Sequence, residues 1–406
     1  MRIATILRPV SAQMLAIAAL GFQTVAHGQQ FEPTDALPAV ISTAPDHGLS
    51  TEFQFQKLPG ATSAPVITAL AGSRDGRFLA AAGDDHAIRI VDTTSGKTIQ
   101  TVIGHQDWIQ SLVFVYPNKA PQESNPISDS SSGLASDSLY SVNQDTKDKP
   151  NPVIPDLYSA GHDGRILRWK YSFPLEAEEV AIVPYAVRSI SISAQRSLLA
   201  IGGFSDEVLI YDLAAGQFVQ RLKCNLKDQR TVRFSPDGSR VLSGSRDGEI
   251  RVWDSQSGKL IAEYRHHQRR VHTAAFSPDG NFVTSAGEDR RVIRFDLEEQ
   301  RVLWSTELAM SKMMTLCLVN EDMIAVAGAD NKIRLLDAQS ESVVAELTGH
   351  SGTVAVMTPC GGSLASGSFD TTVRLWNLTA LERDRSRASL PTSLTPIQVD
   401  AKTQIR

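Results

Sequence analysis

The stretch Ser243-Gly-Ser-Arg-Asp-Gly-Glu-Ile-Arg-Val-Trp-Asp254 predicts two β-strands joined by a tight turn at Asp247-Gly248. Glycine supplies the positive φ angle that a two-residue hairpin turn needs, and an aspartate side chain can accept hydrogen bonds from nearby backbone N–H groups. Taken alone, the stretch indicates only a hairpin whose second strand ends in Trp253-Asp254.

The same hairpin occurs seven times along the chain. Each copy begins at an aspartate, and the copies span Asp85–Asp92, Asp163–Lys170, Asp206–Asp212, Asp247–Asp254, Asp289–Asp296, Asp330–Asp337 and Asp370–Asn377. From residue 170 onward, successive copies end 40 to 42 residues apart, whereas the interval from Asp92 to Lys170 is 78 residues, one period plus an insertion. A period of about 40–45 residues with four strands per unit is typical of β-propeller blades.

These repeats resemble the WD40-repeat family over residues 51–380. The resemblance implies an all-β fold, a seven-bladed WD40 β-propeller, in which each sequence unit supplies the outer strand of one blade and three inner strands of the next. Six outer-strand candidates follow the hairpins: Thr98–Ile103, Val180–Tyr185, Gln217–Lys223, Leu260–Arg265, Val302–Leu308 and Ser342–Thr348.

The seventh outer strand is predicted to come from residues 52–58, which precede the first complete hairpin. This segment alternates apolar and polar residues, as a half-buried strand does. We therefore expect an N-terminal strand to join the last blade and close the ring. Closure removes exposed sheet edges, which otherwise promote aggregation.

Residues 1–28 have the pattern of an export signal peptide. Arg2 and Arg8 charge the start, Val10 to Phe22 is mostly apolar, and Ala26 and Gly28 suit the −3 and −1 positions of a cleavage site. The apolar run is short for a membrane span of about 20 residues, so an uncleaved anchor or a buried helix is the alternative. We expect a periplasmic or otherwise extracytoplasmic protein with no stable membrane span after cleavage.

Three further segments are predicted to lie outside the blades. Residues 29–50 contain Pro33, Pro38 and Pro45 and are interpreted as a linker. Residues 116–156, between the first two strands of blade two, are rich in Ser, Asp, Asn and Pro, which favours a disordered insertion, with a partner-binding arm as the alternative. Residues 381–406 show no strand pattern and are expected to form a flexible tail.

Composition excludes some classes of function. The formal net charge of −5 argues against nucleic acid or an anionic membrane as the main target. The three cysteines, Cys224, Cys317 and Cys360, lack metal-ligand spacing. Cys224 and Cys317 lie in apolar strand contexts and are interpreted as small buried side chains, with one disulfide as the alternative.

The resemblance implies a structural role for the repeated aspartates. In this family a hydrogen-bond network links a histidine before the first strand, a serine or threonine in the second strand, the turn aspartate and a tryptophan in the third. The matching residues are, in blade two, His105, Ser159, Asp163 and Trp169; in blade four, Ser243, Asp247 and Trp253; in blade five, His267, Ser285 and Asp289; and in blade seven, His350, Ser366, Asp370 and Trp376.

Blades four and five depart from this pattern. Asn225 stands at the histidine position of blade four, and Phe295 replaces the tryptophan of blade five. Blades one, three and six retain only Asp85, Asp206 and Asp330. A buried network is stable only when its members satisfy one another.

No catalytic or metal site is predicted. The His266-His267…His272 cluster fits no standard zinc spacing and has no nearby cysteine. Neither a convincing Ser-His-Asp set nor a glycine-rich phosphate loop between a strand and a helix is present. We expect no cofactor.

The candidate binding surface is the end of the ring that carries the aspartate turns, here called the top face. The family commonly receives peptide or protein partners there. Residues before the turn aspartates, and residues at the start of the first strands, supply the predicted partner-binding set: Trp108, His162, Arg188, Arg230, Arg246, Arg270, Lys312 and Phe369. Tryptophan and arginine are enriched at energetic hot spots, although the same residues could simply be a solvated rim.

The sequence thus predicts a non-catalytic, exported interaction scaffold, a monomeric propeller that binds an acidic or aromatic-containing segment of a protein or peptide. One alternative is an enzyme or a small-molecule or carbohydrate-binding propeller that uses the central channel. That alternative needs titratable residues on the first strands, which read as apolar or small. Another is a protein that accompanies a redox partner, although the chain has no C-x-x-C-H haem motif.

Overall fold

The computed structural model describes residues 50–59, 63–116, 155–170, 175–225, 227–308 and 311–379, and the backbone of residues 397–400. All of them belong to one compact unit, Pro38–Arg406. The predicted signal peptide, nearly all of the predicted linker and most of the insertion at 116–156 lie outside the described residues. No helix among the described residues is long and apolar enough to cross a membrane.

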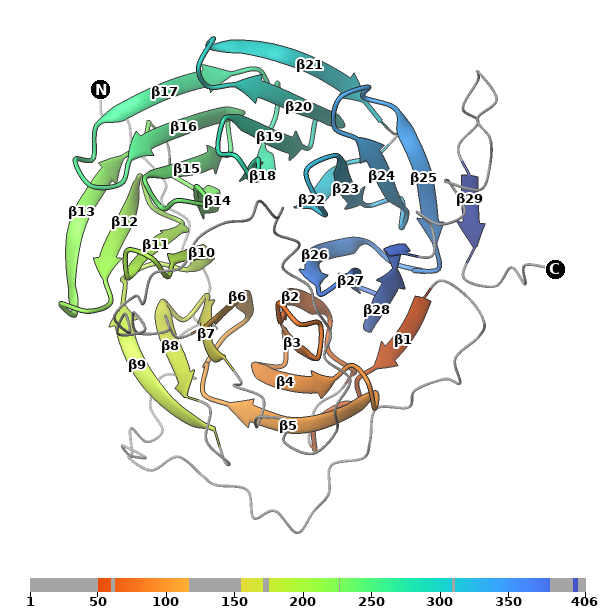
Figure 1. Cartoon of the computed structure of the whole chain (residues 1–406). Coiled ribbons are helices and arrows are strands. Elements are labelled where there is room, and N and C mark those ends of the chain that lie inside the picture. Colours follow the sequence, from red (N-terminus) through yellow and green to blue (C-terminus); the bar gives the residue numbers. More distant parts are fainter. Residues whose placement is uncertain are drawn as a thin grey trace, which may run out of the picture. The chain divides into compact units, whose positions relative to one another are not determined.

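Seven β-sheets surround a central channel, and the first strand of each sheet lies nearest to it (Figure 1). Blade one contains β2 (Ile67–Gly72), β3 (Phe78–Gly83), β4 (Ala87–Asp92) and β5 (Lys97–Ile103). Blade two contains β6 (Ile109–Val115), β7 (Asp156–Gly161), β8 (Arg165–Lys170) and β9 (Glu176–Ile182). Blade three contains β10 (Val187–Ser193), β11 (Leu198–Gly203), β12 (Glu207–Asp212) and β13 (Gln217–Lys223).

The remaining four sheets repeat this arrangement. Blade four contains β14 (Gln229–Phe234), β15 (Arg240–Ser245), β16 (Glu249–Asp254) and β17 (Leu260–Arg265). Blade five contains β18 (Val271–Phe276), β19 (Phe282–Gly287), β20 (Arg291–Asp296) and β21 (Arg301–Glu307). Blade six contains β22 (Met313–Leu318), β23 (Met323–Gly328), β24 (Ile333–Asp337) and β25 (Val343–Thr348). Blade seven contains β26 (Val354–Cys360), β27 (Ser363–Ser368), β28 (Thr372–Asn377) and β1 (Ser50–Gln54). The predicted all-β, seven-bladed propeller is confirmed.

Blade seven takes its outer strand from before blade one. β1 pairs antiparallel with β28, with Glu52 opposite Arg374 and Phe53 opposite Val373. Glu52 and Arg374 also form an ion pair. Phe53 and Phe55 are buried in an apolar cluster that includes residues of blades seven and one. The strand expected within residues 52–58 is therefore present at residues 50–54, and it joins the two ends of the ring.

The predicted bounds of one outer strand are wrong. The outer strand of blade two is Glu176–Ile182 and not Val180–Tyr185, because an outer strand faces solvent and its first half here is acidic and exposed. The apolar Val183 lies after the strand, buried, and its N–H donates to Gly164 O at 2.9 Å.

The C-terminal tail contains a strand, contrary to the sequence prediction. β29 (Ile397–Asp400) pairs in parallel with β25 and makes blade six five-stranded. An outer strand leaves a row of backbone N–H and C=O groups unpaired, and such an edge accepts a further strand. Ile397-Gln-Val-Asp400 alternates β-branched and polar residues, a short pattern that fits the role.

Neighbouring blades are joined by apolar packing and by hydroxyl groups. Leu242 and Val252 of blade four, for example, share one cluster with Val271 and Phe295 of blade five. Between first strands, Thr68 Oγ1 donates to Ile109 O at 2.5 Å, Ser111 Oγ accepts from Ile190 N at 3.2 Å, and Thr315 Oγ1 accepts from Met357 N at 3.1 Å. These bonds satisfy backbone groups at the inner sheet edges that the ladders leave unpaired.

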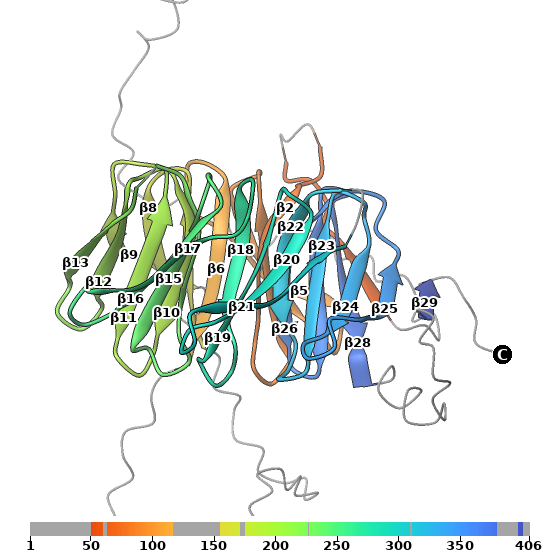
Figure 2. The same cartoon turned by 90° about the horizontal axis from the view of Figure 1, so that it is seen from above.

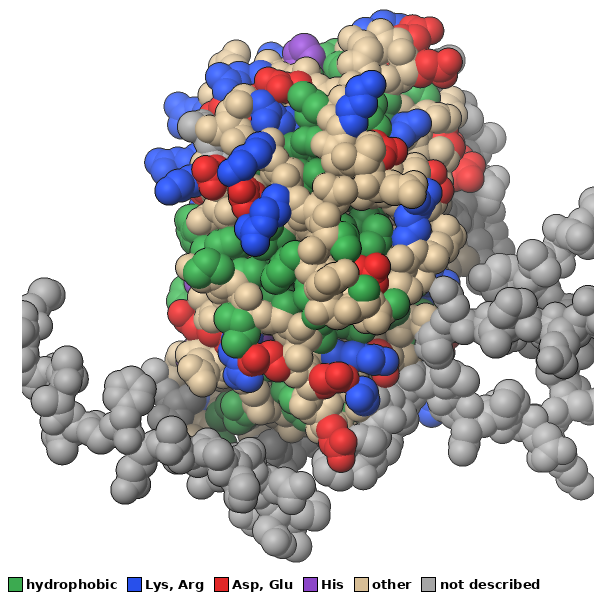
Figure 3. Space-filling model, turned by 90° about the vertical axis from the view of Figure 1, so that its left-hand side faces the viewer, with side chains coloured by type: hydrophobic (Ala, Val, Ile, Leu, Met, Phe, Trp, Pro, Cys, Tyr) green, Lys and Arg blue, Asp and Glu red, His purple; other side chains and the backbone are tan. Residues whose placement is uncertain are grey.

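The strands cross the ring from one face to the other, so their connections gather on two opposite faces (Figure 2). The hairpins between second and third strands share the top face with the connections that enter the first strands. The turns between first and second strands lie on the bottom face, where β6 ends at Val115 and β7 begins at Asp156. The side of the ring shows hydrophobic side chains among charged ones (Figure 3), and β13 and β17 expose Phe218, Val219, Leu260 and Ile261.

Candidate functional site

Blade two contains the complete hydrogen-bond network. His105 Nδ1 lies 2.9 Å from Asp163 Oδ2, and His105 Nε2 lies 2.7 Å from Ser159 Oγ. Trp169 Nε1 donates to the same hydroxyl at 2.8 Å. Because the hydroxyl accepts from the indole, its own hydrogen points to Nε2, and Nδ1–H of a neutral imidazole donates to the carboxylate. Gln106 N–H also donates to Asp163, at 2.9 Å.

Blade seven repeats these contacts. His350 Nδ1 lies 3.0 Å from Asp370 Oδ2, and His350 Nε2 lies 2.8 Å from Ser366 Oγ. Trp376 Nε1 donates to Ser366 Oγ at 2.8 Å. Thr372 Oγ1 adds a donor to Asp370 at 2.6 Å. His350, Ser366 and Trp376 are buried and the Asp370 side chain is 8% exposed, which is the environment that the predicted structural role requires.

Blade five has the network without its last member. His267 bridges Asp289 at 2.9 Å and Ser285 at 2.8 Å. Phe295, which stands where the tryptophan would be, stacks on Tyr264 with ring centroids 3.9 Å apart. The aromatic packing of this position is kept while the indole donor is lost.

The predicted network of blade four does not form. Among the described hydrogen bonds, none joins Ser243 to Asp247 or Trp253. Asn225 is shorter than a histidine and donates instead to Glu249 Oε1 at 2.8 Å, while Asp247 forms an ion pair with the outer-strand residue Arg265.

The three network aspartates are held in the ionised form. Burial alone would raise the pKa of Asp163, but the hydrogen bonds from His105 and from Gln106 N–H outweigh it and lower the pKa to about 2. Burial likewise opposes the lowered pKa of Asp289, and its bond with His267 prevails. The pKa of Asp370 falls further below its usual range, since His350 and Thr372 both donate to it against the effect of burial.

The turn of blade three differs from the prediction. β11 ends at Gly203 and β12 begins at Glu207, so Phe204 follows the strand directly, where His162 follows β7. Ser205 therefore stands at the aspartate position, and its Oγ accepts from Glu207 N at 3.1 Å. Asp206 is the third turn residue and not the network aspartate. The top-face residue of this blade is Phe204, which the sequence analysis missed by counting back from the aspartate.

A β-bulge near the start of every first strand defines a ring at the channel mouth. The ladder with the second strand skips one residue in each blade, and these residues are Thr68, Gln110, Arg188, Arg230, His272, Met314 and Ala355. All seven line the channel. A bulge re-aims the side chain of its extra residue. The ring is cationic or polar on the side of blades two to five and neutral elsewhere.

An aromatic row lies beside this ring. Trp108 and His162 stack with ring centroids 6.0 Å apart, and His162 meets the edge of Phe204 at 6.4 Å. The guanidinium groups of Arg188 and Arg230 lie 4.7 and 5.8 Å from the centre of the Phe204 ring. Such contacts are the geometry of cation–π attraction. Trp108 and Phe204 remain 46% and 41% exposed, so they offer apolar surface to a partner.

The basic residues of the predicted set differ in how far they are neutralised. Arg230 pairs with Asp228 at 2.8 Å, whereas Arg270 and Lys312 approach Glu288 at 3.2 and 3.8 Å. Arg188 and Arg246 have no ion pair within the described part of the chain. Burial, followed by the nearby charge of Arg230, lowers the pKa of Arg188 to about 10.

The structure thus brings Trp108, His162, Arg188, Arg230 and Arg270 together on blades two to five. Phe369 of blade seven lies on the same face, 47% exposed, and also lines the channel. Arg246 and Lys312 are exposed at the rim.

The metal, cysteine and pocket candidates elsewhere in the described residues offer fewer functional groups than the top face. No group of three or more His, Cys, Asp or Glu side chains within the described residues is placed to hold a metal ion. His272 instead contacts Glu288 at 3.3 Å, and burial, opposed by that contact, lowers its pKa to about 4. All three cysteines are free thiols.

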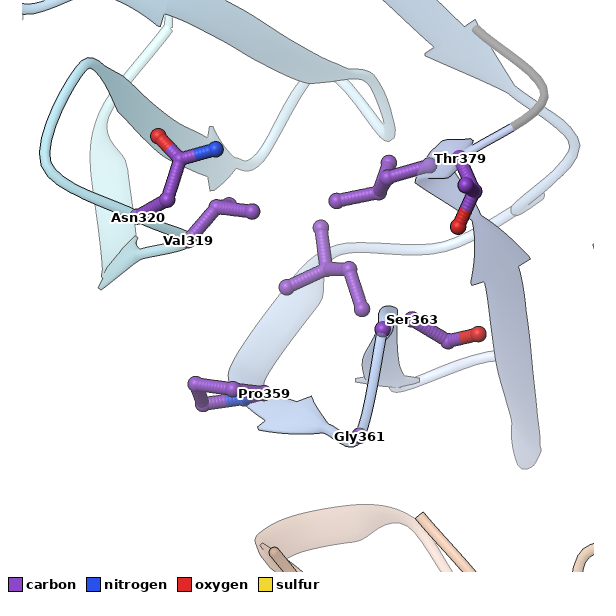
Figure 4. Close-up of a pocket in the computed structure, with 9 residues that line it drawn as sticks. Val319, Asn320, Pro359, Gly361, Ser363 and Thr379 are labelled. Carbon is purple, nitrogen blue, oxygen red and sulfur yellow. The ribbon is translucent and has the colours of Figure 1, made fainter. Parts of the chain in front are cut away.

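A small hollow of about 210 Å³ opens between blades six and seven, with Val319, Asn320, Pro359 and Thr379 around it (Figure 4).

The geometry defines a propeller built from WD-type repeats with a mixed aromatic and cationic top face. Four segments match the family described as WD domain, G-beta repeat: residues 53–92, 216–254, 258–296 and 341–377. Each begins at or beside the outer strand of one blade and ends with the third strand of the next. The chain therefore contains four repeats of the WD40 type within its seven-bladed propeller.

One curated relative is similar to a part of the chain. Cell division control protein 4 of Saccharomyces cerevisiae (strain ATCC 204508 / S288c) is 42% identical over 71 residues, which cover 17% of this chain and 9% of that protein. The match therefore spans less than a tenth of the length of that relative.

Proposed function

We propose that this protein is a non-catalytic interaction scaffold that acts outside the cytoplasm and binds a peptide or protein partner on its top face. WD40 propellers are typical protein-interaction scaffolds. The observation that carries the proposal is the row Trp108–His162–Phe204 with Arg188 and Arg230 against it. Aromatic and arginine side chains in this arrangement are the usual anchors of a binding hot spot.

The chemistry of the row favours a partner segment that is acidic or contains an aromatic residue. Arg188 and Arg246 have no carboxylate partner among the described residues, so an acidic side chain of the partner would supply one. Trp108 and Phe204 would stack on an aromatic or aliphatic side chain. The acidic overall charge of the protein makes this basic face the natural place for an anionic partner to dock.

Export of the protein rests on the sequence of residues 1–28, with its basic start, apolar run and small residues before position 28. The test is the mass of the purified protein from a fractionated cell. A chain that begins after Gly28 and lies in the extracytoplasmic fraction would support export, and a full-length cytoplasmic chain would contradict it.

Partner binding is tested by affinity capture from the envelope fraction followed by mass spectrometry. The double variant Trp108→Ala/Arg246→Ala should lose proteins that the wild type captures. The matched control is Phe218→Ala/Leu260→Ala, which removes exposed apolar side chains of 36% and 41% exposure from the side of the ring. Capture by the top-face variant that equals that of the wild type would reject the top face as the binding surface.

A further inference from the structure

The channel contains a second ring of equivalent residues below its mouth. In each first strand, the residue three positions after the bulge also lines the channel. These seven residues are Ala71, Val113, Ser191, Arg233, Ala275, Cys317 and Thr358. The channel has a volume of about 560 Å³. Arg233 is the one charged member. No aspartate or glutamate is among the described residues that line the channel.

Arg233 has no anionic partner within the described part of the chain. Its Nη1 donates to Ser189 Oγ at 3.1 Å and to Val232 O at 3.0 Å, and no described carboxylate oxygen lies within ion-pair distance. The side chain is exposed to the channel, and desolvation by the surrounding channel wall lowers the pKa of the guanidinium. Because no carboxylate pairs with it, its remaining N–H groups are available to an anion that enters the channel.

Arg188 stands one level above on the same side of the channel. It donates to Gln110 Oε1 at 3.2 Å and has no ion pair with a described residue, while its Nε is buried without a hydrogen-bond partner. Ser189, the next residue of β10, is the hydroxyl that accepts from Arg233. The two arginines therefore come from adjacent blades and line the channel at successive levels, each bonded to a neutral polar side chain of the lining, Gln110 for Arg188 and Ser189 for Arg233.

We propose that the central channel binds an anion, a carboxylate or phosphate group that enters from the top face and is held by Arg188 at the mouth and Arg233 below it. Guanidinium groups match the oxygens of both anions and form charge-assisted hydrogen bonds with them. Gln110, Ser189 and Ser191 supply neutral polar groups on the same wall. The neutral opposite wall leaves room for the carbon skeleton of an organic anion.

A ligand in the central channel was the less favoured alternative from the sequence, because the first strands read as apolar or small. Arg188, Arg230, Arg233 and His272 do lie on those strands and do face the channel. Arg188 and Arg230 were predicted as top-face residues, whereas Arg233 and His272 were not assigned to the channel, because only the bulge register shows which residues of a first strand point to the axis.

The test is isothermal titration calorimetry of the purified propeller at low ionic strength with citrate and, separately, with inorganic phosphate. We expect saturable binding with one site per chain for at least one of the two, weakened about tenfold or more in Arg233→Gln because a charge-assisted bond is lost. Arg233→Lys keeps the charge and should retain part of the affinity. The control Arg240→Gln removes an arginine that also donates to a backbone carbonyl, Gly280 O at 3.2 Å, outside the channel lining.

Absence of saturable binding of both anions up to about 10 mM, or equal affinities for the wild type and a folded Arg233→Gln variant, would overturn the proposal. Thermal melts establish that each variant is folded, and Arg233→Lys carries the test if the glutamine variant is not. Partner capture by Arg233→Gln is measured in parallel. Loss of citrate or phosphate binding with capture retained supports a free anion, and loss of both supports an acidic group of the partner in the channel.

Discussion

Phe53 of β1 lies directly opposite Val373 of β28, and its side chain is completely buried between the last blade and the first. Replacing Phe53 by alanine should lower the free energy of unfolding by about 3–5 kcal/mol, because a large buried aromatic is lost and a cavity remains. Urea denaturation followed by circular dichroism measures the change. The control is Gln54→Ala in the same strand, whose side chain is exposed; a similar cost for both would mean that β1 does not hold the ring through Phe53.

The network of blade seven should contribute more stability than the turn of blade four. Asp370→Ala removes the carboxylate that His350, Thr372 and Ser351 N–H all contact, so it strands buried donors and should cost about 1–3 kcal/mol. Asp247→Ala breaks an ion pair with the exposed Arg265 and a hydrogen bond from Ser245 Oγ, which can still donate to Glu249 O, so it should cost less than about 1 kcal/mol. The urea unfolding midpoints of both variants are compared with that of the wild type. An unchanged midpoint for Asp370→Ala would refute the network role.

Low pH should destabilise the propeller by protonating the network aspartates, of which Asp163 is the example. The pKa of Asp163 is about 2 in the folded protein, below the value of about 3.9 expected in the unfolded chain. Its contribution, on the order of 2 kcal/mol, is therefore present at neutral pH and is lost as the pH falls from about 4 towards 2. Urea unfolding at a series of pH values should show this loss, and it should be smaller in Asp163→Asn. Equal pH dependence in that variant would contradict the assignment.

The strand β29 should protect the outer edge of blade six. A chain that ends at residue 390 lacks β29, so the amides of β25 that its backbone covers should exchange with solvent about tenfold faster or more. The other outer strands serve as internal controls, because β29 does not touch them. Hydrogen exchange with mass spectrometry over residues 343–348 measures the effect, and unchanged exchange there would mean that the tail does not stay on β25.

Phe204 should matter for partner binding although no sequence motif marks it. Phe204→Ala removes the ring that Arg188 and Arg230 flank and should weaken partner capture about tenfold, a usual loss for a hot-spot aromatic. Phe218→Ala, which removes a phenylalanine of similar exposure from the side of the ring, is the control. Retained affinity in Phe204→Ala would place the binding surface elsewhere.

Much of the fold was predictable because turn chemistry repeats. The aspartate hairpins fixed the number of blades, and the count of outer strands pointed to residues 52–58. Prediction failed where local sequence is ambiguous: the acidic outer strand Glu176–Ile182 looks like a loop, and the four residues of β29 gain their conformation only from the edge of β25.

The site was harder to predict than the fold. The networks of blades two, five and seven were predicted through the resemblance to the WD40 family, whose histidine, serine and aspartate positions these blades match. The blade-four network failed because Asn225 cannot span the distance that a histidine covers. Phe204 and Arg233 depend on turn length and on the bulges, which no residue pattern in a single repeat reveals.

Glu52 and Arg374, which face each other across the ring closure, are separated by 322 residues of chain. At about 5–20 residues per second of synthesis, the first of these strands emerges from the ribosome tens of seconds before its neighbour. The six other sheets can form as they appear, but the seventh has to wait for material made at both times. Closure of the ring therefore cannot precede the synthesis of β28, and β1 stays without its partner strand until then.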